Sequence, residues 1–199
     1  MTVIAGMQPL TIERVPPSAD NLRQLSILRT VVFREWPYLY DADSTYEEGY
    51  LQDFLGSANA TVVVARVGDI YVGMATASPL SSQPLALTAP LRQAGIAIDQ
   101  CFYFGESVLL PQFRGIGGGH RFFDEREQAA RAAGAAAAIF CAVIREDDHP
   151  LRPADPRDLS PFWRSRGYRP LGIRCQMEWK EVGRVSDCSH MMQFWMKSL

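Results

Sequence analysis

The sequence lacks a long hydrophobic run and an excess of charge of one sign. Its longest apolar stretch, 134–144, is about half of what a membrane-spanning helix requires. The first residues, Met1–Ala5, lack the basic flank of a signal peptide. With 20 Lys and Arg against 22 Asp and Glu, the net charge is -2, which gives no basic field for a polyanion. We therefore expect a cytoplasmic protein that binds neither membranes nor nucleic acid.

Clustered metal ligands are also lacking. The four cysteines are widely and irregularly spaced, at Cys101, Cys141, Cys175 and Cys188. This spacing favours reduced, packed thiols over a disulfide framework or a zinc site. No group of His, Cys and Asp has the spacing of metal ligands, so we predict no metal. The 199 residues, 47% of them hydrophobic, are enough for one core and predict one domain over 1–199, with its core at 10–180.

Hydrophobic periodicity and turn residues predict a chain that alternates between strands and helices. Ser18 or Asp20 caps a first helix that runs to Trp36, and Thr45–Glu48 match the capping box of a second helix through 55. Gly68-Asp69 separate two β-branched runs and predict a hairpin. The predicted strands cover 11–15, 61–67, 70–77, 102–110, 137–144, 172–180 and 191–197, and the remaining predicted helices cover 90–95, 117–133 and 160–167.

A glycine-rich turn gives the sharpest chemical signal, with the sequence Pro-Gln-Phe-Arg-Gly-Ile-Gly-Gly-Gly-His at 111–120. Glycines let backbone amides approach an anion, and the following helix adds its positive end. A nucleotide P-loop requires Gly-Lys-Ser/Thr, which this turn lacks, and a dinucleotide fingerprint would have His120 at its third small position. The remaining alternative is a turn that only packs the helix closely on the sheet.

Arg114–Gly119 match the pattern Arg/Gln-x-x-Gly-x-Gly/Ala at every fixed position. Here the sequence resembles the GNAT superfamily of acyl-CoA-dependent N-acetyltransferases. The strand before the turn, the helix and apolar strand after it, and Phe162–Tyr168 extend the resemblance, because the last segment is similar to the family's short helix ending in Gly-Phe/Tyr. The resemblance implies a single-domain α/β fold with a mostly antiparallel mixed sheet, splayed at its centre and flanked by helices.

The resemblance also implies an N-acetyltransferase that moves an acetyl or acyl group from acetyl-CoA directly to an amine in a ternary complex. The diphosphate of the coenzyme is then expected on the amides of the turn, and the pantetheine arm along the preceding strand. Gly118 replaces the usual aliphatic residue of the family and is expected to loosen the start of the helix. The implied coenzyme contacts are Val108, Leu109, Leu110, Gln112, Arg114, Gly115, Ile116, Gly117, Gly118, Gly119, His120 and Trp163.

Two groups on the strand before the turn are the implied catalysts. The backbone N–H of Leu109 is the expected hydrogen-bond donor to the oxyanion. Glu106 is the expected general base, and the alternative is that it pairs with an arginine or faces solvent. Trp163 stands where many family members have the tyrosine that protonates the departing thiolate. The candidates left for that proton donor are Tyr168, Tyr103, Ser165 and water.

An acidic and aromatic segment is expected to line the acceptor pocket and to suit a cationic amine, through Tyr38, Tyr40, Asp41 and Tyr46. The alternative is a solvated loop with partly buried rings. Loops 79–99 and 145–160 are expected on the substrate side. The acceptor is expected to be a small molecule or a protein. The sequence is compatible with a homodimer and does not determine the oligomeric state. A non-catalytic acyl-CoA-binding module and a nucleotide-binding oxidoreductase are the alternative functions.

Overall fold

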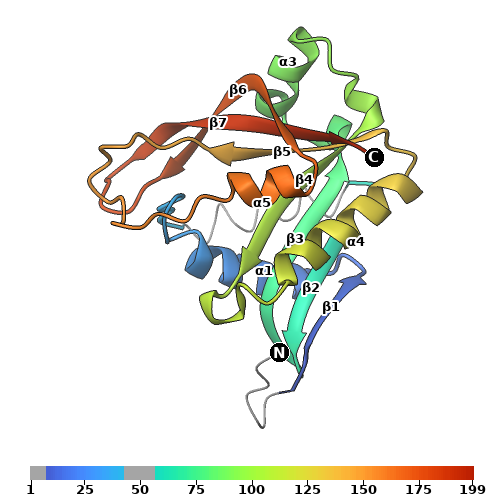
Figure 1. Cartoon of the computed structure of the whole chain (residues 1–199), viewed down its shortest axis with the longest axis horizontal. Coiled ribbons are helices and arrows are strands. Elements are labelled where there is room, and N and C mark those ends of the chain that lie inside the picture. The colour runs from blue at the N-terminus through green and yellow to red at the C-terminus, as the bar shows by residue number, and fades with distance from the viewer. Residues whose placement is uncertain (1–7, 43–56) are drawn as a thin grey trace.

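Seven strands form one sheet in the computed structural model, which describes residues 8–42 and 57–199 (Figure 1). The strand order is β1-β2-β3-β4-β5-β7-β6. The strands are β1 (Leu10–Val15), β2 (Thr61–Val67), β3 (Ile70–Pro79), β4 (Cys101–Leu109), β5 (Ala137–Val143), β6 (Arg169–Lys180) and β7 (Asp187–Ser198). The helices are α1 (Ala19–Val32), α3 (Leu85–Gln93), α4 (Gly118–Ala132) and α5 (Ser160–Ser165), with 3-10 turns η1 (Leu80–Ser82), η2 (Ile98–Gln100) and η3 (Pro111–Phe113).

β4 and β5 run parallel and pair only at their beginnings, where Cys101–Tyr103 meet Ala137–Ile139. Beyond this pairing, β4 stays hydrogen-bonded to β3 as far as Leu109, and β5 stays hydrogen-bonded to β7 as far as Val143. All other neighbouring strands are antiparallel. The sheet is therefore mixed, mostly antiparallel and splayed at its centre, which confirms the predicted fold.

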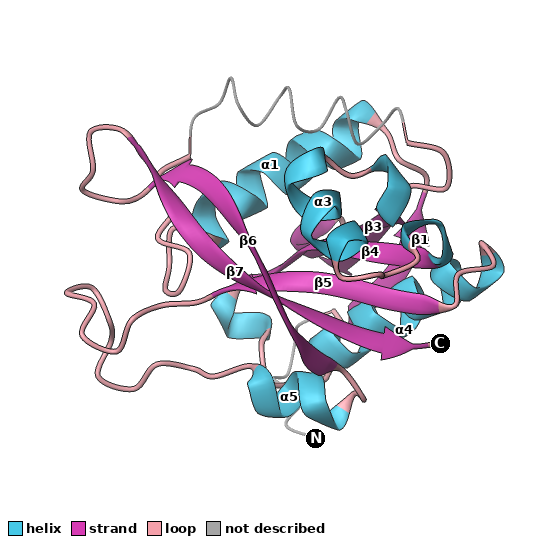
Figure 2. Cartoon of the chain, turned by 90° about the horizontal axis from the view of Figure 1, so that it is seen from above, coloured by secondary structure: helices cyan, strands magenta, loops and turns pink. Residues whose placement is uncertain are grey.

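The helices cover both faces of the sheet because successive strand residues point to opposite sides. On β2, Val62 and Val64 pack with Leu25 of α1, whereas Val63 packs with Phe122 of α4. Figure 2 shows α1 and α3 on one face and α4 and α5 on the other. The splay between β4 and β5 thus connects an α1 side and an α4 side of the molecule.

Two helices differ from the prediction in their bounds. The first helix begins after its N-cap Ser18, as expected, but ends at Val32 instead of Trp36. The helix predicted at 90–95 is α3, which begins earlier and holds Pro90 inside it. Buried Leu87 and Leu91 of α3 supply packing that offsets the cost of an internal proline. The helix predicted from Thr45 through 55 lies outside the described residues.

The strand and hairpin predictions are confirmed within a few residues at each end. Gly68 in the turn between β2 and β3 has a φ of 57°, the conformation that glycine favours. The four cysteines form no disulfide. Among the described helices, none has both the length and the apolar character needed to cross a membrane.

Candidate functional site

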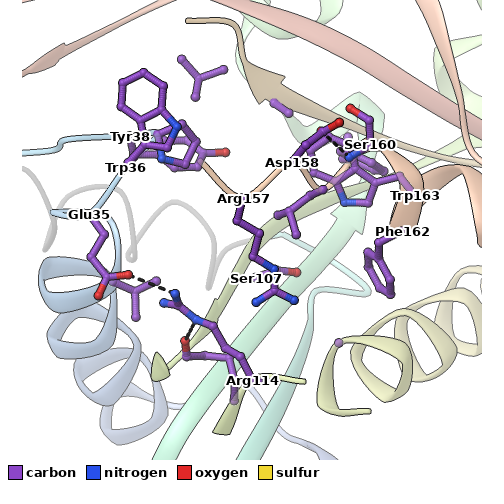
Figure 3. Close-up of a pocket in the computed structure, with 18 of the residues that line it drawn as sticks. Glu35, Trp36, Tyr38, Ser107, Arg114, Arg157, Asp158, Ser160, Phe162 and Trp163 are labelled. Carbon is purple, nitrogen blue, oxygen red and sulfur yellow. Dashed lines mark hydrogen bonds and ion pairs between the residues drawn. The ribbon is translucent and has the colours of Figure 1, made fainter. Parts of the chain in front are cut away.

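The splay opens into a pocket of about 730 Å³ (Figure 3). Its walls come from β4, the glycine turn and the start of α4, from β5, from loop 145–160 and α5, and from segment 32–38. Phe123 and Phe162 of the wall belong to the core on the α4 side, whereas Tyr38 and Cys141 belong to the core on the α1 side. The pocket therefore reaches both faces of the sheet between β4 and β5.

The glycine turn forms the pocket wall at the start of α4. Gly115 and Gly117 have φ values of 80° and 91°, which side chains disfavour. A Cβ on Gly119 would lie 3.4 Å from the Phe162 ring, at van der Waals contact, so α4 packs closely on α5 at this position. The first amides of α4 have no acceptor within the helix and lie at its positive end. The turn is thus shaped to hold an anion.

Arg114 fixes the turn to its neighbours. Its Nε donates a hydrogen bond to the Leu109 carbonyl oxygen at 2.8 Å, and its Nη1 lies 3.0 Å from Glu35 Oε2 (Figure 3). The Arg114 side chain also lines the pocket. Arg114 therefore holds the turn in place as well as adding positive charge to the wall.

The Leu109 amide points into the splay. Leu109 on β4 is paired in register with Gly73 on β3. The next residue, Leu110, donates its N–H to the Val72 carbonyl at 2.9 Å. Hydrogen-bonded and non-hydrogen-bonded pairs alternate along antiparallel strands, so the N–H and C=O of Leu109 face away from β3. The hydrogen bond from Arg114 to the Leu109 carbonyl agrees with this direction. The expected oxyanion donor thus lies at the pocket wall.

Five predicted coenzyme contacts do not line the pocket: Val108, Leu110, Gln112, Ile116 and Gly118. Val108 is fully buried against α1, and the amide of Leu110 is bound to β3. A Cβ on Gly118 would lie 3.2 Å from the Leu109 side chain, so this glycine lets the start of α4 lie close to β4, and the predicted loosening of the helix stays a prediction. The other two side chains are exposed to solvent. Leu109, Arg114, Gly115, Gly117, Gly119, His120 and Trp163 do line the pocket.

Aromatic side chains form the pocket wall at α5. Trp163 lies edge-on to Phe140 and to Trp195, with ring centroids 5.1 Å apart in both pairs. Phe162 makes a similar contact with His120 at 4.9 Å. This interlocked set gives the pocket a rigid apolar wall that suits the alkyl chain of a ligand.

Glu106 lies outside the pocket lining and faces α1. Its Oε1 pairs with Arg29, its Oε2 accepts a hydrogen bond from Thr76 Oγ1 at 2.6 Å, and both partners are buried with it. The register between β3 and β4 shifts between Ala75 and Ala77, and such a bulge changes the face to which the next side chains point. The structure matches the alternative in which Glu106 pairs with an arginine, and does not bring the expected base to the pocket.

The structure contradicts the assignment of Tyr168 as a general acid. Tyr168 is fully buried, does not line the pocket, and donates its hydroxyl to Glu127 Oε1 at 3.2 Å. Burial and the negative charge of Glu127 raise the pKa of this phenol. Tyr103 shares a hydrogen bond with a cysteine sulfur, Ser165 donates to a backbone carbonyl, and neither lines the pocket.

The predicted acceptor residues separate into different environments. Tyr38 lines the pocket, whereas Tyr40 is buried in the core. Asp41 pairs with Lys180 and Arg34, whose hydrogen bonds hold the pKa of this carboxyl below its usual value. The fourth residue, at position 46, lies outside the described residues. The acidic lining expected for a cationic amine is therefore not found at Asp41.

The two predicted substrate-side loops also differ. Loop 145–160 contributes a large part of the pocket wall, from Arg145 to Ser160. Segment 79–99 contributes no lining residue and instead packs through α3 against the core beneath β6. Of the two loops, loop 145–160 alone therefore belongs to the site.

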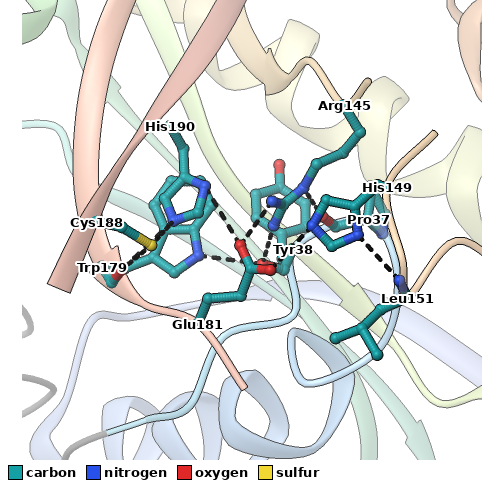
Figure 4. Close-up of polar contacts among 9 residues, drawn as sticks. All are labelled: Pro37, Tyr38, Arg145, His149, Leu151, Trp179, Glu181, Cys188 and His190. Atoms are coloured by element: carbon teal, nitrogen blue, oxygen red, sulfur yellow. Dashed lines mark hydrogen bonds and ion pairs between the residues drawn. The ribbon is translucent and has the colours of Figure 1, made fainter. Parts of the chain in front are cut away.

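An ion-pair cluster on the α1 side holds the pocket wall at Tyr38 (Figure 4). Arg145 donates its Nε and Nη2 to the backbone carbonyls of Pro37 and Tyr38, both at 2.6 Å. Its Nη1 lies 2.7 Å from Glu181 Oε2, and His149 Nε2 lies 3.0 Å from the other carboxylate oxygen. We call this set, with His190, the Glu181 cluster. It was missed in the sequence because its members have no common spacing.

Glu181, Cys188 and His190 form a grouping that the sequence spacing did not indicate. A carboxylate oxygen, the Sγ atom and a ring nitrogen of these residues all lie within 4.8 Å of one another. Cys188 Sγ is 3.3 Å from His190 Nε2, and the His190 ring stacks on Trp179 at 3.7 Å. Because Arg145 and His149 already contact both carboxylate oxygens of Glu181, the geometry is that of an ion-pair cluster.

Arg126 of α4 is a second buried group at the pocket, and the sequence alone did not identify it. Its Nη1 donates to the carbonyls of Thr76 and Glu106 at 3.4 and 3.3 Å, and its guanidinium lies over the Phe104 and Phe123 rings. Burial lowers the pKa of Arg126 to about 10, so it stays charged at neutral pH. Arg126 thus fixes the bulge of β4 at the floor of the pocket.

Comparison with solved structures identifies the fold. No family model and no curated protein matches the sequence. Ribosomal-protein-alanine N-acetyltransferase from Brucella melitensis matches with a TM-score of 0.60 and 17% identity, over 95% of this chain and 99% of the other. An acetyltransferase of the GNAT family from Streptococcus pneumoniae matches with a TM-score of 0.58 and 15% identity, over 96% and 100%.

A third match is a candidate acetyltransferase from Salmonella typhimurium, solved with its cofactor acetyl-CoA. Its TM-score is 0.58 and its identity 13%, over 96% of this chain and 95% of the other. The chain therefore has the fold of GNAT acetyltransferases, as its sequence predicts.

Proposed function

We propose that the protein is an acyl-CoA-dependent N-acyltransferase that moves an acetyl group from acetyl-CoA to an amine. The observation that supports this best is the pocket, which joins an anion-binding turn to a strand edge and opens on both faces of the sheet. A coenzyme on the α4 side and an amine on the α1 side would meet at the splay. The acetyltransferase fold of the solved neighbours supports the same general activity.

The residues of the α4 side fit the parts of acetyl-CoA. The amides from Gly117 to His120, with Arg114, suit the diphosphate because they combine N–H donors with positive charge. The pantetheine arm would lie between Ser107 and Leu109 of β4 and the Trp163 wall of α5. Acetyl-CoA would thus be a second substrate that binds along one wall of the pocket.

The reaction would be direct transfer. The lone pair of the amine nitrogen attacks the thioester carbon, and the carbonyl oxygen becomes an oxyanion near the Leu109 N–H. The oxyanion then collapses, the carbon–sulfur bond breaks, and its electron pair stays on sulfur. Nitrogen loses one proton to water and sulfur gains one, which gives an amide and free CoA. Positioning of the two substrates and hydrogen bonding to the oxyanion would supply most of the rate enhancement.

A non-catalytic acyl-CoA-binding module is the second candidate. It is favoured by the placement of Glu106 and Tyr168, which both lie outside the pocket lining. Such a module would bind acetyl-CoA but release no thiol with any amine. The two candidates thus differ in turnover and not in binding.

Thermal unfolding with saturating acetyl-CoA, CoA, NAD and ATP tests the coenzyme site. A ligand at 100 times its Kd stabilises the folded state by about 2.7 kcal/mol, which raises the Tm of a protein of this size by roughly 5 to 10 °C. We expect this shift with the two CoA compounds. A shift with NAD alone, or none with CoA, would reject the proposed function. Thiol release with a panel of amines then separates the enzyme from the binding module.

A further inference from the structure

Arg157 places a free positive charge in the pocket wall. It belongs to loop 145–160, and Figure 3 shows its guanidinium directed into the pocket, with Tyr38 on one side of it and Trp163 on the other. Within residues 8–42 and 57–199, no group forms a hydrogen bond or an ion pair with this side chain. A guanidinium carries five N–H donors in a planar fork and no acceptor. The donors of Arg157 are therefore available to an anionic ligand.

The carboxylates of the described pocket wall, in contrast, are already bound. Glu35 lies 3.0 Å from Arg114, Asp147 lies 2.7 Å from Arg152, and Asp158 accepts the Ser160 N–H at 2.8 Å. Arginines outnumber these carboxylates in the same wall, at positions Arg114, Arg126, Arg145, Arg152 and Arg157. An acceptor whose only charge is an ammonium group would find no free carboxylate there. An acceptor with an anionic group would find a free guanidinium.

The proposed reaction sets where such an anionic group can lie. The acceptor amine has to reach the thioester, which the proposed binding mode places beside Ser107 and Leu109 of β4. In an α-amino acid, a single carbon separates the amine from the carboxylate, so both groups enter the same part of the pocket. Arg157 and Ser107 line one pocket, and the guanidinium points from the loop toward β4 in Figure 3. The guanidinium is therefore directed toward the part of the pocket that the carboxylate of an amino acid would enter.

The α1 side of the wall suits the rest of an amino acid. Trp36 and Tyr38 present aromatic rings there, against which a neutral side chain can pack. We propose that the acceptor is an amino acid with a neutral side chain, and that Arg157 binds its carboxylate. Arg157 thereby determines which amines are acceptors, by selecting those that also carry a negative charge. This inference rests on the proposed function and names its substrate class.

The phosphates of the coenzyme are the other anions of the proposed reaction. The amides at the start of α4 and Arg114 already offer donors to the diphosphate. Binding of Arg157 to the acceptor and binding of Arg157 to the coenzyme therefore predict different kinetic changes. The first raises the KM of the amine, and the second raises the KM of acetyl-CoA.

The test compares amino acids with their amides in the wild type and in Arg157→Gln. Leucine, methionine and phenylalanine are each paired with the corresponding amino acid amide, which keeps the amine and the side chain but has no carboxylate. Thiol release from acetyl-CoA is measured with these pairs and with a panel of polyamines, aminoglycosides and peptides. Each acceptor is compared between the two proteins, so differences in amine basicity cancel.

Arg157→Gln should raise the KM of the amino acids about 10- to 100-fold, the range for a lost hydrogen bond to a charged group. The KM values of the amides and of acetyl-CoA should stay within about twofold. Arg157→Lys keeps the charge without the planar fork and should recover part of the loss. Arg174→Gln is the matched control, because Arg174 on β6 is also exposed and has no side-chain partner within the described ranges, but lies outside the pocket lining. It should keep the wild-type KM values.

Four results would overturn the inference. An equal rise in KM for amino acids and amides would show that the carboxylate is not what Arg157 binds. A rise in the KM of acetyl-CoA alone would assign Arg157 to a coenzyme phosphate. A wild type that acetylates polyamines or aminoglycosides but no amino acid would reject this inference and leave the proposed function standing. Thiol release with no amine at all would reject the proposed function, and this inference with it.

Discussion

The two sides of the pocket are built in different ways. The α4 side consists of the turn at 111–120 and the aromatic wall of α5, and its contacts to a ligand would come largely from backbone amides. The α1 side consists of Tyr38 and the Glu181 cluster, in which Arg145 reaches a carbonyl 107 residues away in the chain. One side depends on backbone conformation and the other on buried side-chain charges.

This difference predicts opposite sensitivities to mutation. Backbone amides remain when a side chain changes, so the α4 side should tolerate most substitutions that leave the φ values of its glycines unstrained. A buried ion pair fails when one partner is removed, because the other is left charged and unpaired. Loss of a side chain on the α1 side should therefore lower stability, whereas coenzyme binding should respond mainly to changes that strain the backbone of the turn.

The largest expected effect is on stability, from Glu181→Ala. This change leaves Arg145, only 8% exposed, without its carboxylate partner, and should lower the free energy of unfolding by about 3 to 5 kcal/mol. Urea denaturation measures the loss. Glu13→Ala is the matched control, because its ion pair with Arg66 is exposed and should contribute less than about 1 kcal/mol. Equal losses in the two variants would contradict the structural role of the cluster.

On the α4 side, Gly117→Val should weaken coenzyme binding by straining the backbone of the turn. A β-branched residue is strained at a φ of 91°, and relief of the strain would turn the amides of α4 away from the anion, so the Kd for acetyl-CoA should rise at least about tenfold. Gly134→Val is the control, since Gly134 has a φ of 78° beyond the other end of α4. Both variants should lose similar stability. A similar rise in Kd for both would show that strain alone, and not the turn, weakens binding.

Acid should lower the stability of the protein through the Glu181 cluster, by less than the Glu181→Ala change does. Burial and the charge of Arg145 lower the pKa of His190 below 6.5. Burial raises the pKa of Glu181, but hydrogen bonds and charge from Arg145 and His149 outweigh it and bring that pKa below 4.5. Both groups bind protons more readily in the unfolded chain, so stability should fall as the pH drops below about 6.5, and again below about 4.5.

The measurement for this prediction is the Tm of the wild type and of His190→Gln between about pH 7.5 and pH 5. The wild type should lose more stability over this range than the variant, because the variant has no imidazole at that position to protonate. Parallel curves would mean that His190 is not held neutral by its burial near Arg145.

The parts of the fold that follow from short segments could be predicted. Gly68-Asp69 predicted the hairpin because the turn requires a positive φ, and the pattern around the glycine turn predicted the strand β4 before it and the helix α4 after it. The anion-binding shape of the turn follows from the same residues. In each case the physical cause lies within about ten residues of the chain.

The parts that depend on distant packing could not be predicted. Glu106 was placed on the correct strand, but the bulge opposite Ala75 and Ala77 decides which face it meets, and no residue type marks that bulge. The partners of Glu181 come from separate loops, so no spacing could have joined them. The sequence predicted a helix over 90–95, whereas core packing of Leu87 and Leu91 places it at Leu85–Gln93.

The most direct test of the central claim is product analysis of the wild-type protein with acetyl-CoA and the amine panel, by mass spectrometry and thiol detection together. The proposed function predicts an acetylated amine and free CoA in equal amounts, from a reaction that depends on the protein. Acetyl-CoA that binds but leaves every amine of the panel unmodified would contradict it and identify the pocket as a binding site without transfer.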